Sequence, residues 1–106
     1  MNFQTEGADT ASALSAYGRS LAGQGLYDEA HAYLKRALSI REGVLGKQDF
    51  DTSTSLLNLG VLLQLQGRDA EARPYLERAL AVREEVCGED HPATDLVRQN
   101  LALLDS

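Results

Sequence analysis

Apolar side chains recur along this chain at the spacing of amphipathic helices, and one such stretch occurs twice. The segment from residue 25 to residue 46, GLYDEAHAYLKRALSIREGVLG, returns 42 positions later as GRDAEARPYLERALAVREEVCG. More than half of the aligned positions are identical. A fixed offset of this kind is typical of repeat proteins, in which each unit buries its apolar face against its neighbour.

The apolar pattern predicts five helices, at about residues 8–23, 27–44, 50–66, 69–87 and 92–104. Glycines follow the first four, where the left-handed backbone of a helix end suits glycine, and Pro92 suits the first turn of the fifth. We therefore expect an all-α fold, an α-solenoid of antiparallel helix pairs with five helices in about two and a half repeats.

A glycine lies in the middle of the first and third predicted helices, at Gly18 and Gly60. Glycine inside a helix costs about 1 kcal/mol relative to alanine, so its recurrence favours a purpose in packing. We expect each glycine to mark a close helix crossing, with Ala30 and Ala72 as the small partners across it.

The same periodicity suggests how the chain is divided. Residues 1–6 are expected to form a disordered leader, and residues 7–106 a single domain. Within this domain we expect one repeat at 7–48, a second at 49–90 and a C-terminal capping helix at 91–106. In this last helix Arg98 and Asp105 replace leucines of the second repeat, and such a polar edge is typical of a solvating cap.

The composition excludes several classes of partner. The 106 residues include 16 acidic and 10 basic side chains, for a net charge of −6. This balance argues against nucleic acid and against an anionic membrane surface as ligands. The only cysteine, Cys87, rules out an internal disulfide and fits a reducing compartment. With no signal-peptide pattern and no apolar run of about 20 residues, a cytoplasmic location is expected.

No chemistry-bearing motif is found. His31 and His91 have no Cys or Asp partner at ligand spacing, and the chain contains no phosphate-binding glycine loop and no nucleophile motif. Surface positions are the simpler interpretation of both histidines. We therefore expect no enzymatic activity, no cofactor and no metal site.

The repeated pattern resembles the tetratricopeptide repeat. It is carried by Leu14-x2-Tyr17-Gly18-x2-Leu21 with Ala30-x3-Leu34-x2-Ala37, and by the equivalent positions 42 residues on. The period is longer than the usual repeat of about 34 residues, and no proline closes each unit. The longer form is similar to the kinesin-light-chain type, also found in nephrocystin-like proteins, over residues 7–104, with EARPYLERALAVREEVCGEDHP at residues 71–92 as its clearest match.

The resemblance implies a concave groove, lined by the first helix of each pair, that binds a peptide or protein segment. Counted along those helices, the residues expected to face this groove are Ser15, Arg19, Thr54, Leu57, Asn58, Val61, Gln99 and Asn100. Two of them are asparagines 42 residues apart, and an amide can both donate to and accept from an extended peptide backbone. The alternative is that these are ordinary solvated residues.

A structural function is the second hypothesis. Leu101 and Leu104 in the last predicted helix would be covered by a further helix in a longer array. If they are exposed, they favour self-association as a dimer or as an end-to-end assembly. The chain could equally be a fragment of a longer array, and the sequence leaves these alternatives open.

Overall fold

The computed structural model describes residues 7–105, so the leader expected at residues 1–6 lies outside the described part. Five helices and no strand occur within it. The helices are α1 (Ala8–Gly23), α2 (Tyr27–Leu45), α3 (Phe50–Leu65), α4 (Asp69–Cys87) and α5 (Pro92–Leu104). Each predicted boundary agrees within one residue, and the predicted all-α solenoid is confirmed.

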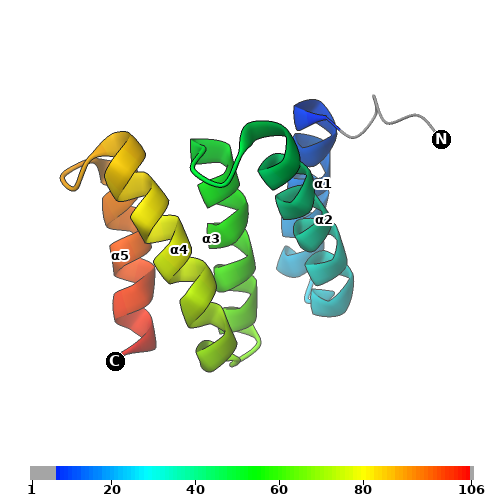
Figure 1. Ribbon diagram of the computed structural model, residues 1–106. Helices are drawn as coiled ribbons and strands as arrows, with labels where there is room; N and C mark the ends of the chain where they lie inside the picture. Colours follow the sequence, from blue (N-terminus) through cyan, green and yellow to red (C-terminus); the bar gives the residue numbers. More distant parts are fainter. Residues whose placement is uncertain (1–6, 106) are drawn as a thin grey trace.

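Successive helices run in opposite directions and form a right-to-left series from α1 to α5 (Figure 1). The two strongest contacts lie within the pairs α1–α2 and α3–α4, and α5 packs against α4. Helix α3 contacts all four other helices. A central helix covered from several sides must be apolar around most of its circumference, which explains why α3 contributes so many core residues, among them Leu56, Leu59, Leu62 and Leu63.

The repeat extends to the backbone of the turns. Gly25 and Gly67, which follow the first helix of each pair, have φ angles of 81° and 75°. Gly46 and Gly88, which follow the second, have φ angles of 94° and 97°. Residues other than glycine rarely adopt a positive φ angle. The recurrence of glycine after 42 residues therefore means that the corresponding turns of the two repeats have the same backbone conformation.

The expected close helix crossings are present. A β-carbon added at Gly18 would lie 2.8 Å from Cγ of Leu34 and 3.3 Å from the carbonyl oxygen of Ala30. The main partner of the glycine is therefore the leucine side chain, while the small residue contributes its backbone. Close approach of α1 and α2 depends on the missing side chain at this point.

Side chains also stabilise the starts of two helices. Oδ1 of Asp49 accepts a hydrogen bond from the backbone N–H of Asp51 at 2.8 Å and caps α3. Nδ1 of His91 accepts from the backbone N–H of Ala93 at 3.0 Å and caps α5. The exposed His91 thus has a structural contact at the helix start, which its sequence context did not predict.

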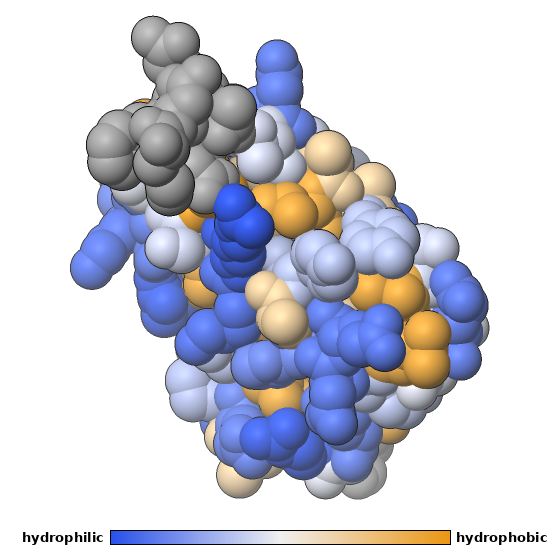
Figure 2. All heavy atoms as spheres, turned by 90° about the vertical axis from the view of Figure 1, so that its right-hand side faces the viewer, coloured by the Kyte–Doolittle hydropathy of each residue, from blue (hydrophilic) through white to orange (hydrophobic). Residues whose placement is uncertain are grey.

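Figure 2 looks at the end of the molecule formed by α1 and α2. On the described part of this face, apolar residues form separate patches among hydrophilic ones. The largest apolar side chains exposed on these two helices are Tyr17, at 53%, and Val44, at 54%. Patches divided in this way are common on soluble proteins and do not by themselves indicate an interface.

Candidate functional site

A groove of about 400 Å³ crosses the layer formed by the first helices of the repeats. Its walls come from α1, α3 and α5, with one residue from α2. The lining residues are Arg19, Ala22, Gly23, Leu34, Leu57, Asn58, Val61, Leu62, Leu65, Leu96 and Asn100. The repeat places equivalent turns of successive helices side by side, so side chains far apart in sequence share one surface.

Most of the residues predicted to face a groove do line this one. They are Arg19, Leu57, Asn58, Val61 and Asn100. Three of these five residues lie on α3, whereas Thr54 of the same helix is outside the lining. One lies on α1 and one on α5, and each of these helices also has one predicted residue outside the lining.

Two exposed leucines extend the apolar part of the groove. Leu65 is 58% exposed and Leu96 is 46% exposed, although both are large apolar side chains. Leu65 was missed as a site residue. The sequence nevertheless indicates its position, because Leu57, Val61 and Leu65 are spaced four residues apart and so lie along one face of α3.

The two asparagines of the groove differ in their hydrogen bonds. Nδ2 of Asn100 donates to the carbonyl oxygen of Leu96 at 2.9 Å. Nδ2 of Asn58 is buried and has no hydrogen-bond partner within residues 7–105. A buried donor without an acceptor costs about 1–3 kcal/mol, so the groove carries one amide with an unmet need for an acceptor.

Three predicted groove residues lie elsewhere, which corrects the expected lining. Ser15 is buried, because it shares a face of α1 with the buried Ala11 and Gly18. Thr54 is engaged by an arginine, as described below. Gln99 is exposed and does not line the groove, since no described helix packs beyond α5.

Two buried arginines connect the repeats. Nη1 of Arg41 donates to Oγ of Ser55 at 2.9 Å, and Nη2 lies 3.4 Å from Oγ of Ser12. The matching Arg83 donates through Nε to Oγ of Ser53 at 2.9 Å and through Nη2 to Oγ1 of Thr54 at 3.1 Å. Arg41 thus joins α2 to α1 and to α3, the first helices of both repeats. Arg83 joins α4 to α3 of its own repeat and, through the carbonyl oxygen of Ala93, to α5. Because each arginine links helices of neighbouring repeats, we call them inter-repeat braces.

The environment of Arg83 is unusual for a cation. Its side chain is 3% exposed, and within residues 7–105 its hydrogen-bond partners are neutral oxygens, including the carbonyl of Ala93 at 2.9 Å. The guanidinium carbon lies 4.6 Å from the centroid of the Phe50 ring, a cation–π contact. Burial lowers the pKa of Arg83 from its ordinary value, but a guanidinium stays protonated at neutral pH.

The two leucines expected to be exposed on α5 are instead half-buried. Leu101 and Leu104 pack against the core cluster, because the last helix turns them toward the rest of the domain. The exposed leucines of α5 are Leu96 and Leu103, at 46% and 63%. The premise of the self-association hypothesis is therefore corrected in part.

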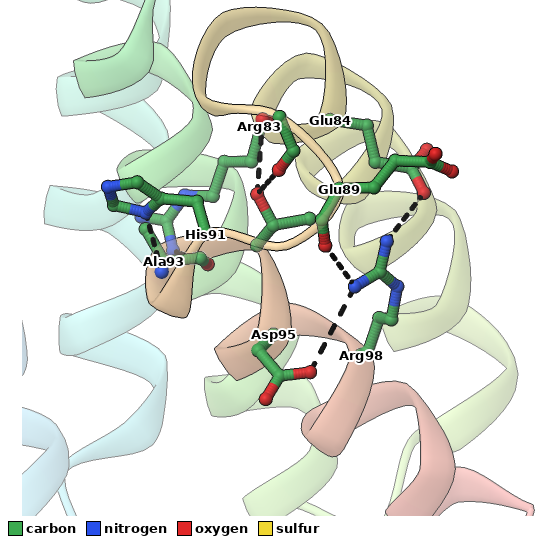
Figure 3. A network of polar contacts seen from close by, with 9 residues as sticks. Arg83, Glu84, Glu89, His91, Ala93, Asp95 and Arg98 are labelled. Carbon is green, nitrogen blue, oxygen red and sulfur yellow. Dashed lines mark hydrogen bonds and ion pairs between the residues drawn. The ribbon is translucent and has the colours of Figure 1, made fainter.

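Charged residues surround the first turns of α5 (Figure 3). Nη1 of Arg98 donates to the carbonyl oxygen of Glu89 at 2.6 Å, and Nη2 lies 3.2 Å from Oε2 of Glu84. Asp95 lies 3.9 Å away on the same helix. Arg98 is therefore partnered at the surface, and the cost of burying it in a leucine position does not arise.

Two negative findings apply to the described residues. No group of three or more His, Cys, Asp or Glu side chains in residues 7–105 is arranged to hold a metal ion. Nor does any helix there have the length and apolar character needed to cross a membrane.

Comparison with known proteins identifies the family of this chain. A comparison with curated proteins finds no match to this chain. A family model described as tetratricopeptide repeat matches residues 9–85 and again residues 51–106, which together cover most of the sequence. This is a non-catalytic family of helical repeats whose members generally bind protein partners. The chain therefore belongs to the tetratricopeptide repeat family.

Proposed function

We propose that this protein is a non-catalytic interaction module that binds an extended peptide or protein segment in the groove lined by α1, α3 and α5. The observation that carries the proposal is the combination, in one groove, of exposed leucines with the buried amide donor of Asn58. A bound backbone would supply the acceptor that Asn58 lacks, and apolar side chains of the segment would cover Leu65 and Leu96.

The size of the groove supports a segment rather than a globular surface. A volume of about 400 Å³ is within the range of small-ligand pockets, about 300–1,000 Å³. Its walls belong to helices held together by the core and by the arginine braces. A groove that is already formed binds with a smaller ordering cost than one that must be assembled.

We also propose that the repeats are of the 42-residue, kinesin-light-chain-like type. The identical offset of the glycine turns supports this assignment. So do first helices of 16 residues paired with second helices of 19 residues. The division into repeats at residues 7–48 and 49–90, followed by a capping helix at 91–106, is part of the same proposal.

Self-association through α5 is the weaker candidate. By the 42-residue equivalence, Arg98 and Asp105 stand where α3 has Leu56 and Leu63, which are 0% and 2% exposed. Those leucines flank Gly60 on the face of α3 that packs against α4. In the last part of the chain the same positions are charged: Arg98 of α5 pairs with Glu84 of α4, and Asp105, directly after α5, pairs with Arg73 of α4. A second copy docking there would have to desolvate these ion pairs.

The proposal is tested by selecting binders from a displayed library of short random peptides. Val61→Trp fills the groove without changing its charge, and Val44→Trp makes the same change at an exposed position of α2 outside the groove. Peptides selected on the unaltered protein should bind the Val44→Trp variant as tightly as the unaltered protein, and they should not bind the Val61→Trp variant.

Circular dichroism and thermal unfolding should show that both variants remain folded. Equal binding to the two variants would place the site elsewhere, and a library that yields no binder would argue against segment binding altogether.

A further inference from the structure

We infer that a second interaction surface lies on α4, where a hollow fits an uncharged tryptophan side chain of a partner protein. The inference does not rest on the proposed function, because the hollow shares no lining residue with the groove between the first helices. It follows from three features of the hollow: a wall with two rings, charges that are already paired, and a backbone oxygen that lacks its helical donor.

The hollow has a volume of about 360 Å³ and is lined by Glu71, Pro74, Tyr75 and Arg78. These residues are spaced three and four positions apart, so they form one face of α4. Arg78 forms an ion pair with Glu42 of α2, so this face lies beside α2. Tyr75 packs against the core and its ring is held in place, whereas Pro74 is exposed. The wall therefore offers two rings to an apolar or aromatic occupant.

The charged residues of the hollow are already compensated within the protein. Glu71 accepts two hydrogen bonds from Arg68, of 2.9 and 2.6 Å. Arg78 pairs with Glu42 at 2.7 Å. A further carboxylate would compete with these partners, and a further cation would be repelled by the two guanidinium groups. A paired guanidinium can still present its flat face to an aromatic ring, and tryptophan gives the strongest contact of this kind.

Pro74 adds a hydrogen-bond acceptor to the wall. It lies inside α4, beyond the first turn, and proline has no N–H to donate. The carbonyl oxygen of Ala70, four residues earlier, therefore lacks its usual α-helical donor. In the first repeat the equivalent residue is Ala32, which keeps its N–H. The second repeat thus has a backbone acceptor that the first repeat does not offer.

Tryptophan matches all three features. Its indole ring is uncharged, can cover the rings of Pro74 and Tyr75, and carries one N–H donor and no acceptor. Phenylalanine or leucine would cover the oxygen of Ala70 without supplying a donor, which leaves a hydrogen bond unmade. Tyrosine carries its donor at the tip of the ring, whereas the indole N–H lies on the edge of the ring system that would cover Pro74.

The probe that tests this inference is the capped peptide Gly-Ser-Trp-Ser-Gly, which carries no charge. The protein contains no tryptophan, so indole fluorescence reports the peptide alone. Titration with the whole chain should give a saturable change in this fluorescence, and backbone amide chemical shifts should change mainly at residues 70–78. Replacing tryptophan by 1-methyltryptophan keeps the ring but removes the donor. This change should weaken binding about threefold to tenfold, the range for one neutral hydrogen bond.

Pro74→Ala is the informative variant. Alanine supplies an N–H to the carbonyl oxygen of Ala70 and favours the helix, so the protein should remain folded. The variant should bind the tryptophan peptide more weakly, by about threefold or more, and should no longer distinguish tryptophan from 1-methyltryptophan. Pro92→Ala is the matched control, since it makes the same substitution at the only other proline, at the start of α5 outside the hollow. It should leave both affinities unchanged.

Several results would overturn the inference: no saturable binding, equal affinities of the unaltered protein for the two peptides, or equal binding of the tryptophan peptide to the Pro74→Ala and Pro92→Ala variants. Chemical-shift changes confined to the groove of α1, α3 and α5 would overturn it as well. None of these results bears on segment binding in the groove, which the Val61→Trp variant tests separately.

Discussion

A β-carbon built on Gly60 would lie 2.5 Å from Cδ2 of Leu76 and 2.7 Å from its Cγ. Both residues are buried, and they lie where α3 crosses α4. Gly18 and Leu34 repeat this contact between α1 and α2. The distance between the two helices of each pair is thus set by a leucine packed against a glycine.

Gly60→Ala should lower the free energy of unfolding by about 1–3 kcal/mol, because the added methyl overlaps Leu76 in a packed interior. Gly43→Ala is the matched control, since its β-carbon would meet nothing within 4 Å. This second change should raise stability by about 0.5–1 kcal/mol, the gain from replacing glycine in a helix. Urea denaturation measures both, and equal effects would refute the close crossing.

Arg83→Met should destabilise the protein by about 2–4 kcal/mol, because it leaves the buried oxygen of Ser53 and the part-buried oxygens of Thr54 and Ala93 without their donor. Arg78→Met removes an exposed ion pair with Glu42 and should change stability by less than about 1 kcal/mol. Thermal and urea unfolding of the two variants give the comparison. Similar losses would mean that the brace contributes no more than a surface pair.

Asn58→Leu should raise stability by about 1 kcal/mol, because it removes a buried donor that has no acceptor. The same change should weaken binding of peptides selected on the unaltered groove. Asn100→Leu is the control for the stability measurement, since the amide of Asn100 already donates to the carbonyl oxygen of Leu96 within its own helix. A loss of stability in the Asn58 variant would indicate that its amide is satisfied in solution.

The free energy of unfolding should fall as His31 becomes protonated. Burial, followed by the nearby charges of Lys35 and Arg68, lowers the pKa of His31 below its usual 6.5. The unfolded chain therefore binds this proton at a higher pH than the folded one. The loss of stability begins as the pH falls through about 6.5 and is complete below the folded pKa.

His31→Gln should reduce the loss of stability between about pH 7 and pH 5, measured by urea unfolding at each pH. Carboxylates titrate in both proteins, so the difference between the two curves isolates the histidine. Identical curves would contradict the assigned shift.

The charged side of the last helix, formed by Arg98 and Asp105, should not bind a second copy of the chain. The unaltered protein is expected to keep one mass over a range of concentrations in light scattering. Arg98→Leu with Asp105→Leu restores the leucines found at the equivalent positions of α3, and this variant should associate.

Lys35→Leu with Asp28→Leu is the matched pair on exposed positions of α2, and it should leave the mass unchanged. If the unaltered protein itself associates, and Leu101→Gln with Leu104→Gln abolishes this, the self-association hypothesis is correct.

Most of the fold could be predicted because local residue types and the periodic spacing of apolar residues determine it. The spacing of apolar residues defines each helix, and glycine at positive φ ends it, as at Gly46 and Gly88. The glycines at the helix crossings were also recognisable, since their cost inside a helix implies a packing role.

The candidate site was predictable only in part. Leu57, Asn58 and Val61, which were expected to face a groove, line the one described here, because α3 is enclosed by neighbours and one helical face is left to the groove. Ser15 lies outside the lining because it is buried on the face of α1 that it shares with Ala11 and Gly18, and its polar side chain alone does not indicate burial.

What the sequence by itself determined is the set of five helices, their ends and their 42-residue register, because these depend on neighbours in the chain and on a repeated pattern. Only the tertiary structure decided how many neighbours cover each face. It also decided which acceptors the long side chain of Arg83 reaches, and which way the leucines of α5 turn. These outcomes depend on the packing of whole helices against one another, which the spacing of residues along one helix does not specify.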